Sequence, residues 1–181
     1  MVNASNRLRS ARKQQKTPCK RRIGAAYKIA QANKKGLNCK TILSLVNCLP
    51  NFLGCFAQDT LSESFIRPPC TLLVNIDSFY LPGSHWLAIG LFKDTLEIFD
   101  PLGFKMFLWE SVPCDLLRFL HQYGQNRKVL ISKRVQPLNS YNCAFYSLFY
   151  VFQRFHYSFE KIQSCFSSMK QNENVLKKFF S

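Results

Sequence analysis

The pattern of hydrophobic and polar residues divides the chain into a polar arm and a domain built from strands and helices. Residues 1–36 are polar and basic, and a helical turn over residues 23–32 is the only apolar period in them. The remaining residues alternate short apolar runs with turn signals. We therefore predict a basic flexible arm over residues 1–36 and a folded domain over residues 37–181. The predicted strands are residues 71–76, 85–92, 96–99 and 128–132.

Helices are predicted before and after these strands. Residues 141–157 are apolar around most of the helix circumference, which indicates a buried central helix. Residues 52–56 are interpreted as a turn with aromatic anchors. Strands in the middle of the chain with helices toward both ends predict an α+β architecture. The other predicted helices are residues 41–49, 112–123, 159–169 and 173–180.

Charge is concentrated in the N-terminal arm. The chain has a net charge of +15 and an apolar fraction of 47%, which is a globular composition with a basic excess. Residues 1–35 contain 11 Lys or Arg and no acid. Such a segment favours phosphate contacts with duplex DNA without sequence preference, although a solvated tail is the plainer interpretation. The predicted DNA-contacting residues are Arg7, Arg9, Arg12, Lys13, Lys16, Lys20, Arg21 and Arg22.

The cysteines do not form a recognisable metal or disulfide pattern. All eight are scattered without a C-x-x-C pair, so no zinc site is predicted. The first residues lack an apolar signal region, which favours reduced thiols inside a cell. No apolar run approaches the roughly 20 residues that span a bilayer, so we expect no membrane association.

Three residues have the chemistry of a nucleophilic site. His85 opens a buried strand, and Asp100 ends the next strand along the chain. Each has a plainer role when taken alone, as a buried histidine or a turn residue. Cys143 begins the central helix, where the helix dipole favours the thiolate. Together they match the requirement of a thiol beside an imidazole that a carboxylate orients.

Three stretches, GSHWLAIGLF, LEIFDPLGF and QPLNSYNCAFYSLFYVF, resemble the adenovirus endopeptidases (adenains). More broadly they resemble the group that includes the ubiquitin-like-protein proteases. The resemblance implies a papain-like fold with the nucleophile Cys143 at the start of the buried helix. It implies His85 as general base, Asp100 as its orienting acid and Gln136 as an oxyanion donor beside the Cys143 backbone N–H. Ala144 stands where the family usually has Gly.

The resemblance also implies a function. We expect a monomeric cysteine endopeptidase that cleaves viral capsid or core precursors in the virion and the host nucleus. Its chemistry requires no cofactor. The resemblance implies that DNA or a basic peptide could activate it. The arm itself contains a short basic stretch with a cysteine, Cys19-Lys20-Arg21-Arg22. One alternative is a protease that removes ubiquitin or a ubiquitin-like modifier. Another is a catalytically inactive protein that binds nucleic acid.

Overall fold

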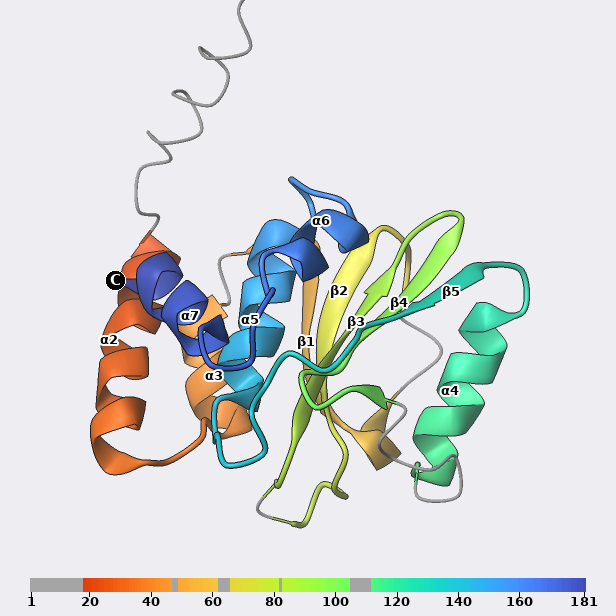
Figure 1. Cartoon of the computed structure of the whole chain (residues 1–181). Helices are drawn as coiled ribbons and strands as arrows, with labels where there is room; N and C mark the ends of the chain where they lie inside the picture. The colour runs from red at the N-terminus through yellow and green to blue at the C-terminus, as the bar shows by residue number, and fades with distance from the viewer. Residues whose placement is uncertain (1–17, 47–48, 62–65, 82, 105–111) are drawn as a thin grey trace, which may run out of the picture.

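The computed structural model describes residues 18–46, 49–61, 66–81, 83–104 and 112–181, which form a mixed β-sheet with helices on both faces (Figure 1). The pairings β2–β3 and β3–β4 are antiparallel, whereas the two outer strands run parallel to their neighbours. The predicted α+β class is confirmed. The sheet follows chain order: β1 (Phe52–Ala57), β2 (Cys70–Asn75), β3 (Trp86–Leu91), β4 (Thr95–Phe99) and β5 (Lys128–Ile131).

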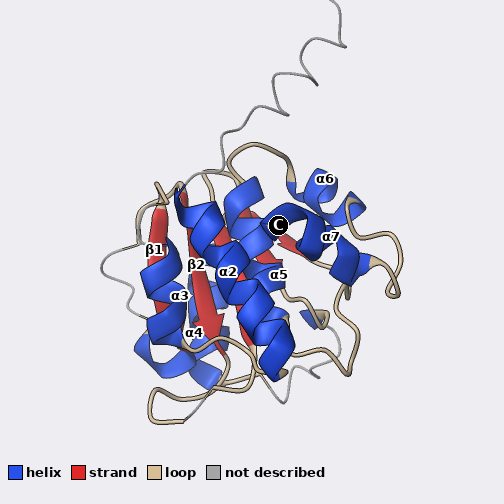
Figure 2. Cartoon of the chain, turned by 90° about the vertical axis from the view of Figure 1, so that its left-hand side faces the viewer, coloured by secondary structure: helices blue, strands red, loops and turns tan. Residues whose placement is uncertain are grey.

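The helices divide unequally between the two faces of the sheet. Helix α4 (Cys114–Gly124) covers one face, and the other described α-helices lie on the opposite side (Figures 1 and 2). A 3-10 turn, η1 (Gln58–Thr60), follows β1. The helices of the larger group are α2 (Pro18–Asn33), α3 (Cys39–Val46), α5 (Cys143–Gln153), α6 (Phe159–Ser164) and α7 (Asn172–Phe180).

Burial on both faces explains the continuous apolar runs of the central strands. In β2, Leu73 packs with α5 and its neighbours, while Leu72 and Val74 pack with α4 on the other face. Successive side chains of a strand point to opposite faces, so both sets must be apolar when helices cover both. All residues of β2 and β3 are accordingly buried.

Helix α5 is the centre of the larger helical layer. Every residue from 143 to 151 is buried, which confirms the prediction of a central helix. The helix packs against β3 and β2, and its N-terminus lies at the end of the sheet where β3 begins (Figure 1). The first residue of this helix is Cys143, so the fold places the thiol next to the start of β3.

The prediction of a flexible arm over residues 1–36 is wrong for residues 18–33, which form α2. Ile23, Tyr27 and Ala30 lie on one face of this helix and are buried in the main core. Three apolar contacts in a basic segment are a weak sequence signal, and only packing against α5 and α7 reveals their role. The folded domain therefore begins before residue 37. Residues 1–17 lie outside the described part of the chain.

Residues 52–56, predicted as a turn, belong to strand β1. Among the described strands β1 pairs with β2 alone, and its register shifts between Phe52 and Cys55. Gly54 has a φ of 136°, a conformation that favours glycine. An irregular edge strand with a central glycine resembles a turn in sequence, which explains the error.

A buried ion pair connects α5 to β4. Glu97 is fully buried, and its carboxylate accepts hydrogen bonds from Arg154 Nε at 2.5 Å and Nη2 at 2.6 Å. Tyr150 Oη donates a third hydrogen bond at 2.7 Å. The Arg154 guanidinium also lies 4.0 Å from the ring of Phe92. These contacts fix the helix of Cys143 relative to the strand that leads to Asp100.

Replacing Arg154 with alanine is expected to lower the free energy of unfolding by about 3 kcal/mol, because Glu97 would remain buried without its counter-ion. Urea denaturation measures the change. Arg118→Ala is the control, since the Arg118–Asp115 pair is exposed and such pairs contribute at most about 1 kcal/mol. Equal losses in the two variants would contradict the structural role of the Glu97 pair.

Candidate active site

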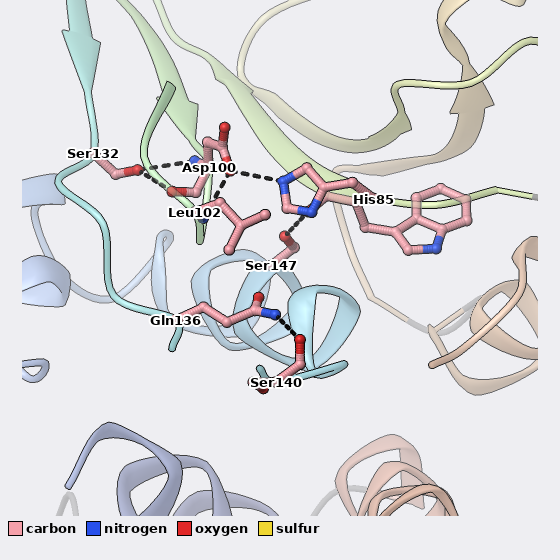
Figure 3. A network of polar contacts seen from close by, with 8 residues as sticks. His85, Asp100, Leu102, Ser132, Gln136, Ser140 and Ser147 are labelled. Atoms are coloured by element: carbon pink, nitrogen blue, oxygen red, sulfur yellow. Dashed lines mark hydrogen bonds and ion pairs between the residues drawn. The ribbon is translucent and has the colours of Figure 1, made fainter. Parts of the chain in front are cut away.

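His85 and Asp100 meet at one end of the β3–β4 hairpin. His85 directly precedes β3 and Asp100 directly follows β4, and the register that pairs Ala88 with Phe99 brings both to the same end of the sheet. The His85 Nε2 and Asp100 Oδ1 atoms are 2.7 Å apart (Figure 3). His85 is 4% exposed and Asp100 is 0% exposed, so little water competes for this interaction.

The backbone around Asp100 holds its carboxylate in place. Asp100 Oδ1 also accepts the Leu102 N–H at 2.9 Å, within a turn closed by Gly103 N–H to Asp100 O at 2.9 Å. Gly103 has a φ of 84°, which explains why this turn requires glycine. On the other side, Ser132 Oγ accepts from the Asp100 N–H at 2.9 Å and donates to its carbonyl at 2.8 Å. Asp100 is therefore oriented before any substrate binds.

The surroundings of His85 favour its protonated form. Burial alone lowers the pKa of an imidazole, but hydrogen bonds to Asp100 and Cys143, together with the charges of these groups, outweigh it and raise the His85 pKa to about 9. The positive charge is thus stabilised between a carboxylate and a sulfur. A protonated imidazole next to a sulfur supplies the positive half of the thiolate–imidazolium pair that cysteine nucleophiles use.

Cys143 is placed beside His85 by the first turn of α5. Its side chain is 7% exposed and interacts with the His85 ring as a hydrogen-bond partner. The ring thus contacts Asp100 through Nε2 and has Cys143 as a second side-chain partner. The structure therefore brings together His85, Asp100 and Cys143 from three separate parts of the chain. Acyl transfer by a cysteine nucleophile requires this order of contacts.

Gln136 lies next to the same centre. Its backbone N–H bonds the Pro101 carbonyl at 2.8 Å, which places it directly beside the Asp100 turn. Its Nε2 donates to the Ser140 carbonyl at 2.7 Å (Figure 3). An amide nitrogen carries a second N–H, so this hydrogen bond orients the group without using up its donors. The role of Gln136 as an oxyanion donor stays a prediction.

Two serines were missing from the residues predicted from sequence. Ser132 holds the Asp100 backbone (Figure 3), and Ser147 Oγ donates to the Trp86 carbonyl at 3.1 Å, one helical turn after Cys143. Ser147 thereby attaches the nucleophile helix to the residue that follows His85. A signal was present for Ser147, because position i+4 shares the helix face of Cys143. A single serine at the end of the strand predicted over residues 128–132 gave no such signal for Ser132.

The described arm residues differ in their exposure. Arg21 and Arg22 are exposed on α2, whereas the Lys20 amine lies 4.0 Å from the centre of the Phe179 ring. Lys20 thus takes part in packing α2 against α7. Arg7, Arg9, Arg12, Lys13 and Lys16 lie outside the described residues.

Neither a metal site nor a membrane-spanning helix is found in the described ranges. Within residues 18–181, less the gaps given above, three or more His, Cys, Asp or Glu side chains nowhere come together in a way that would hold a metal ion. Among the same residues, every helix is too short or too polar to cross a bilayer.

Comparisons with known proteins do not assign the chain to a family. No family model and no curated protein matches the sequence. Among solved structures, the chain is similar to the crystal structure of the selenomethionine form of the ASFV pS273R protease, with 23% sequence identity and a TM-score of 0.38. The similarity covers 64% of this chain and 45% of that protease, so the chain corresponds to less than half of its length.

Proposed function

We propose that the protein is a cysteine endopeptidase with Cys143 as nucleophile, His85 as acid–base group and Asp100 as the residue that orients His85. The observation that carries the proposal is the buried 2.7 Å contact between His85 Nε2 and Asp100 Oδ1, with Cys143 as a further hydrogen-bond partner of the same ring. A histidine needed only for packing would not require both a carboxylate and a thiol at a helix N-terminus as partners.

The proposed reaction has two steps. The Cys143 sulfur attacks the scissile carbonyl carbon, and the C–N bond breaks as His85 gives its proton to the leaving amine. This leaves a thioester on Cys143 and a neutral imidazole. His85 then takes a proton from water, the hydroxide displaces the sulfur as thiolate, and the acid product leaves and gives its proton to the solvent. The negative oxygen formed in each step would be stabilised by the Cys143 backbone N–H and the second N–H of Gln136.

The proposed substrates are capsid or core precursors of a virus, as implied by the resemblance of the sequence to the adenovirus endopeptidases. The proposed setting is the virion and the host nucleus, where the enzyme would act as a monomer. A protease for ubiquitin-like modifiers would use the same residues. The inactive nucleic-acid-binding alternative is less favoured, since a binding scaffold has no chemical need for the His85–Asp100–Cys143 arrangement.

Peptide cleavage tests the proposal. Wild type and Cys143→Ala are incubated with a panel of virion precursor peptides and, separately, with ubiquitin-type conjugates that release a fluorophore. Cleavage of a precursor peptide by wild type alone supports the endopeptidase. If wild type releases the fluorophore only from the modifier conjugates, the protein is a protease for ubiquitin-like modifiers instead. If wild type cleaves neither set, the proposed function is wrong.

We further expect the basic N-terminal residues to bind duplex DNA through phosphates, with an affinity that falls steeply as salt rises. Because α2 belongs to the folded core, the suitable truncation removes residues 1–17 and leaves α2 intact. Combined with Arg21→Gln and Arg22→Gln, this change is expected to weaken DNA binding at least about tenfold.

The same variant should lose DNA stimulation of the cleavage of a DNA-bound substrate, because stimulation would come from tethering enzyme and substrate to one polymer. Cleavage of a short uncharged peptide is the control and should change little. Fluorescence anisotropy at several salt concentrations measures the binding. Unchanged DNA affinity in the variant would mean that the basic residues only solvate the chain.

A further inference from the structure

Glu173, in the first turn of α7, lies outside the proposed catalytic set but contacts the loop that leads into Cys143. Its carboxylate accepts hydrogen bonds from Ser140 Oγ at 2.6 Å and from Asn142 Nδ2 at 2.5 Å. Asn142 is 2% exposed and directly precedes the nucleophile. One side chain from the C-terminal helix therefore holds two residues of the loop before α5.

Helix α2 contacts the same group of residues from the other side. Tyr27 Oη lies 3.4 Å from Glu173 Oε2, and Gln31 Nε2 donates to Asn142 Oδ1 at 2.8 Å. The Tyr27 ring packs edge-on against Phe145 in the first turn of α5, with 4.9 Å between ring centroids. Figure 2 shows α2, α5 and α7 next to one another on this side of the sheet. The two helices nearest the ends of the described chain thus meet at the start of the nucleophile helix.

The loop that Glu173 holds also fixes both predicted oxyanion donors. The Ser140 carbonyl accepts the Gln136 side chain, and the Asn142 N–H bonds Ser140 Oγ at 3.2 Å. Asn142 O in turn accepts the Tyr146 N–H at 3.0 Å, which begins the hydrogen bonding of α5. A shift of the loop would move the Gln136 amide and the Cys143 N–H relative to each other. Donors of this kind act only when they are in place before charge develops.

The geometry points to Glu173 as a positioning residue of the proposed protease site: through Ser140 and Asn142 it sets the relation between Gln136 and Cys143, with α2 supporting the arrangement through Tyr27 and Gln31. This inference rests on the proposed function. Burial and then the charge of Glu173 raise the pKa of Tyr27, so its hydroxyl remains a donor at alkaline pH.

The surroundings of Glu173 make it suitable for mutation. Glu173, Tyr27, Gln31, Ser140 and Asn142 border a cavity of about 600 Å³ that lies between α2, α7 and the loop. Truncation at position 173 therefore removes hydrogen bonds at the edge of a cavity, with little loss of core packing. Glu173→Gln keeps the shape of the side chain and one acceptor oxygen. Its amide nitrogen, however, is a donor, and it would face Ser140 Oγ or Asn142 Nδ2, which are themselves donors to Glu173.

The test compares Glu173→Ala, Glu173→Gln and the control Glu160→Gln. Glu160 is also an acid in the first turn of its helix, α6, but it is exposed. We expect Glu173→Ala to lower kcat for peptide cleavage about 10- to 100-fold with little change in KM, as for a misplaced oxyanion donor. Glu173→Gln should retain an intermediate kcat, and Glu160→Gln should match wild type.

Amide hydrogen exchange provides a readout that does not depend on activity. Exchange at residues 138–146 should be at least about tenfold faster in Glu173→Ala than in wild type, while the strands of the sheet stay protected. Full kcat in Glu173→Ala, or unchanged exchange over this loop, would overturn the inference. If wild type cleaves no peptide, the proposed function fails, and the exchange result still decides whether Glu173 holds the loop.

Discussion

Cys143→Ala is expected to abolish peptide cleavage, with a loss of at least about 10³-fold in kcat/KM, because no other group in the site can form the thioester. Cys165→Ala is the matched control. Its thiol is exposed at the end of α6 and lies outside the site, so this variant should retain wild-type activity. Discontinuous peptide assays on purified protein measure both.

Alkylation tests the same assignment without a substrate. Cys143 is only 7% exposed, whereas Cys114 and Cys165 are exposed. If an imidazolium beside Cys143 stabilises the thiolate, iodoacetamide at neutral pH should modify Cys143 faster than the exposed thiols. The thiols of Cys55 and Cys70 should be slower still, because burial raises their pKa.

The preference for Cys143 should disappear in His85→Ala, and mass spectrometry of the digested protein measures each site. Modification that simply follows exposure, with Cys143 slowest in wild type, would contradict a nucleophile at this position.

Asp100→Asn is expected to lower kcat/KM by roughly 10²- to 10⁴-fold while the protein remains folded, because the amide neither neutralises nor correctly orients the His85 ring. The backbone contacts of Asp100 to Ser132 do not involve the carboxylate, so they persist in the variant. Circular dichroism checks the fold. Wild-type activity in Asp100→Asn would remove Asp100 from the proposed site.

The raised pKa of His85 predicts how stability and activity change with pH. The His85 pKa is raised from 6.5 in the unfolded chain to about 9 in the folded protein. Protonated His85 therefore stabilises the fold fully below pH 6.5, and this contribution, about 3 kcal/mol, is lost as pH rises through 9. The imidazolium needed to protonate the leaving amine disappears over the same range, so kcat/KM should fall above about pH 9.

In Asp100→Asn, stability and activity should both begin to fall at a lower pH than in wild type. The variant lacks the carboxylate that raises the His85 pKa, whereas burial still lowers that pKa. Nuclear magnetic resonance titration of the His85 ring protons measures the shift. An unchanged His85 pKa in the variant would show that Asp100 does not stabilise the imidazolium.

Local pattern was sufficient for the central elements of the fold. The apolar runs at residues 71–76 and 85–92 predicted β2 and β3 within one residue, since burial on both faces leaves a continuous apolar signal. The same logic predicted α5, because a helix that is apolar all round must be buried. Strand β1 was missed and helix α2 was anticipated only as a helical turn over residues 23–32, because an irregular edge strand and a three-residue apolar stripe in a basic segment have weak periodicity.

The sequence by itself determined which groups could act: a histidine before a buried strand, an aspartate after the next one, and a cysteine at a helix start. Only the tertiary structure decided that these groups touch, because the hairpin register and the packing of α5 on β3 bring together residues 58 positions apart, from His85 to Cys143. It also decided what holds them. Ser132 and Glu173 act through hydrogen bonds to distant backbone or side-chain atoms, and such contacts leave no periodic trace in a sequence.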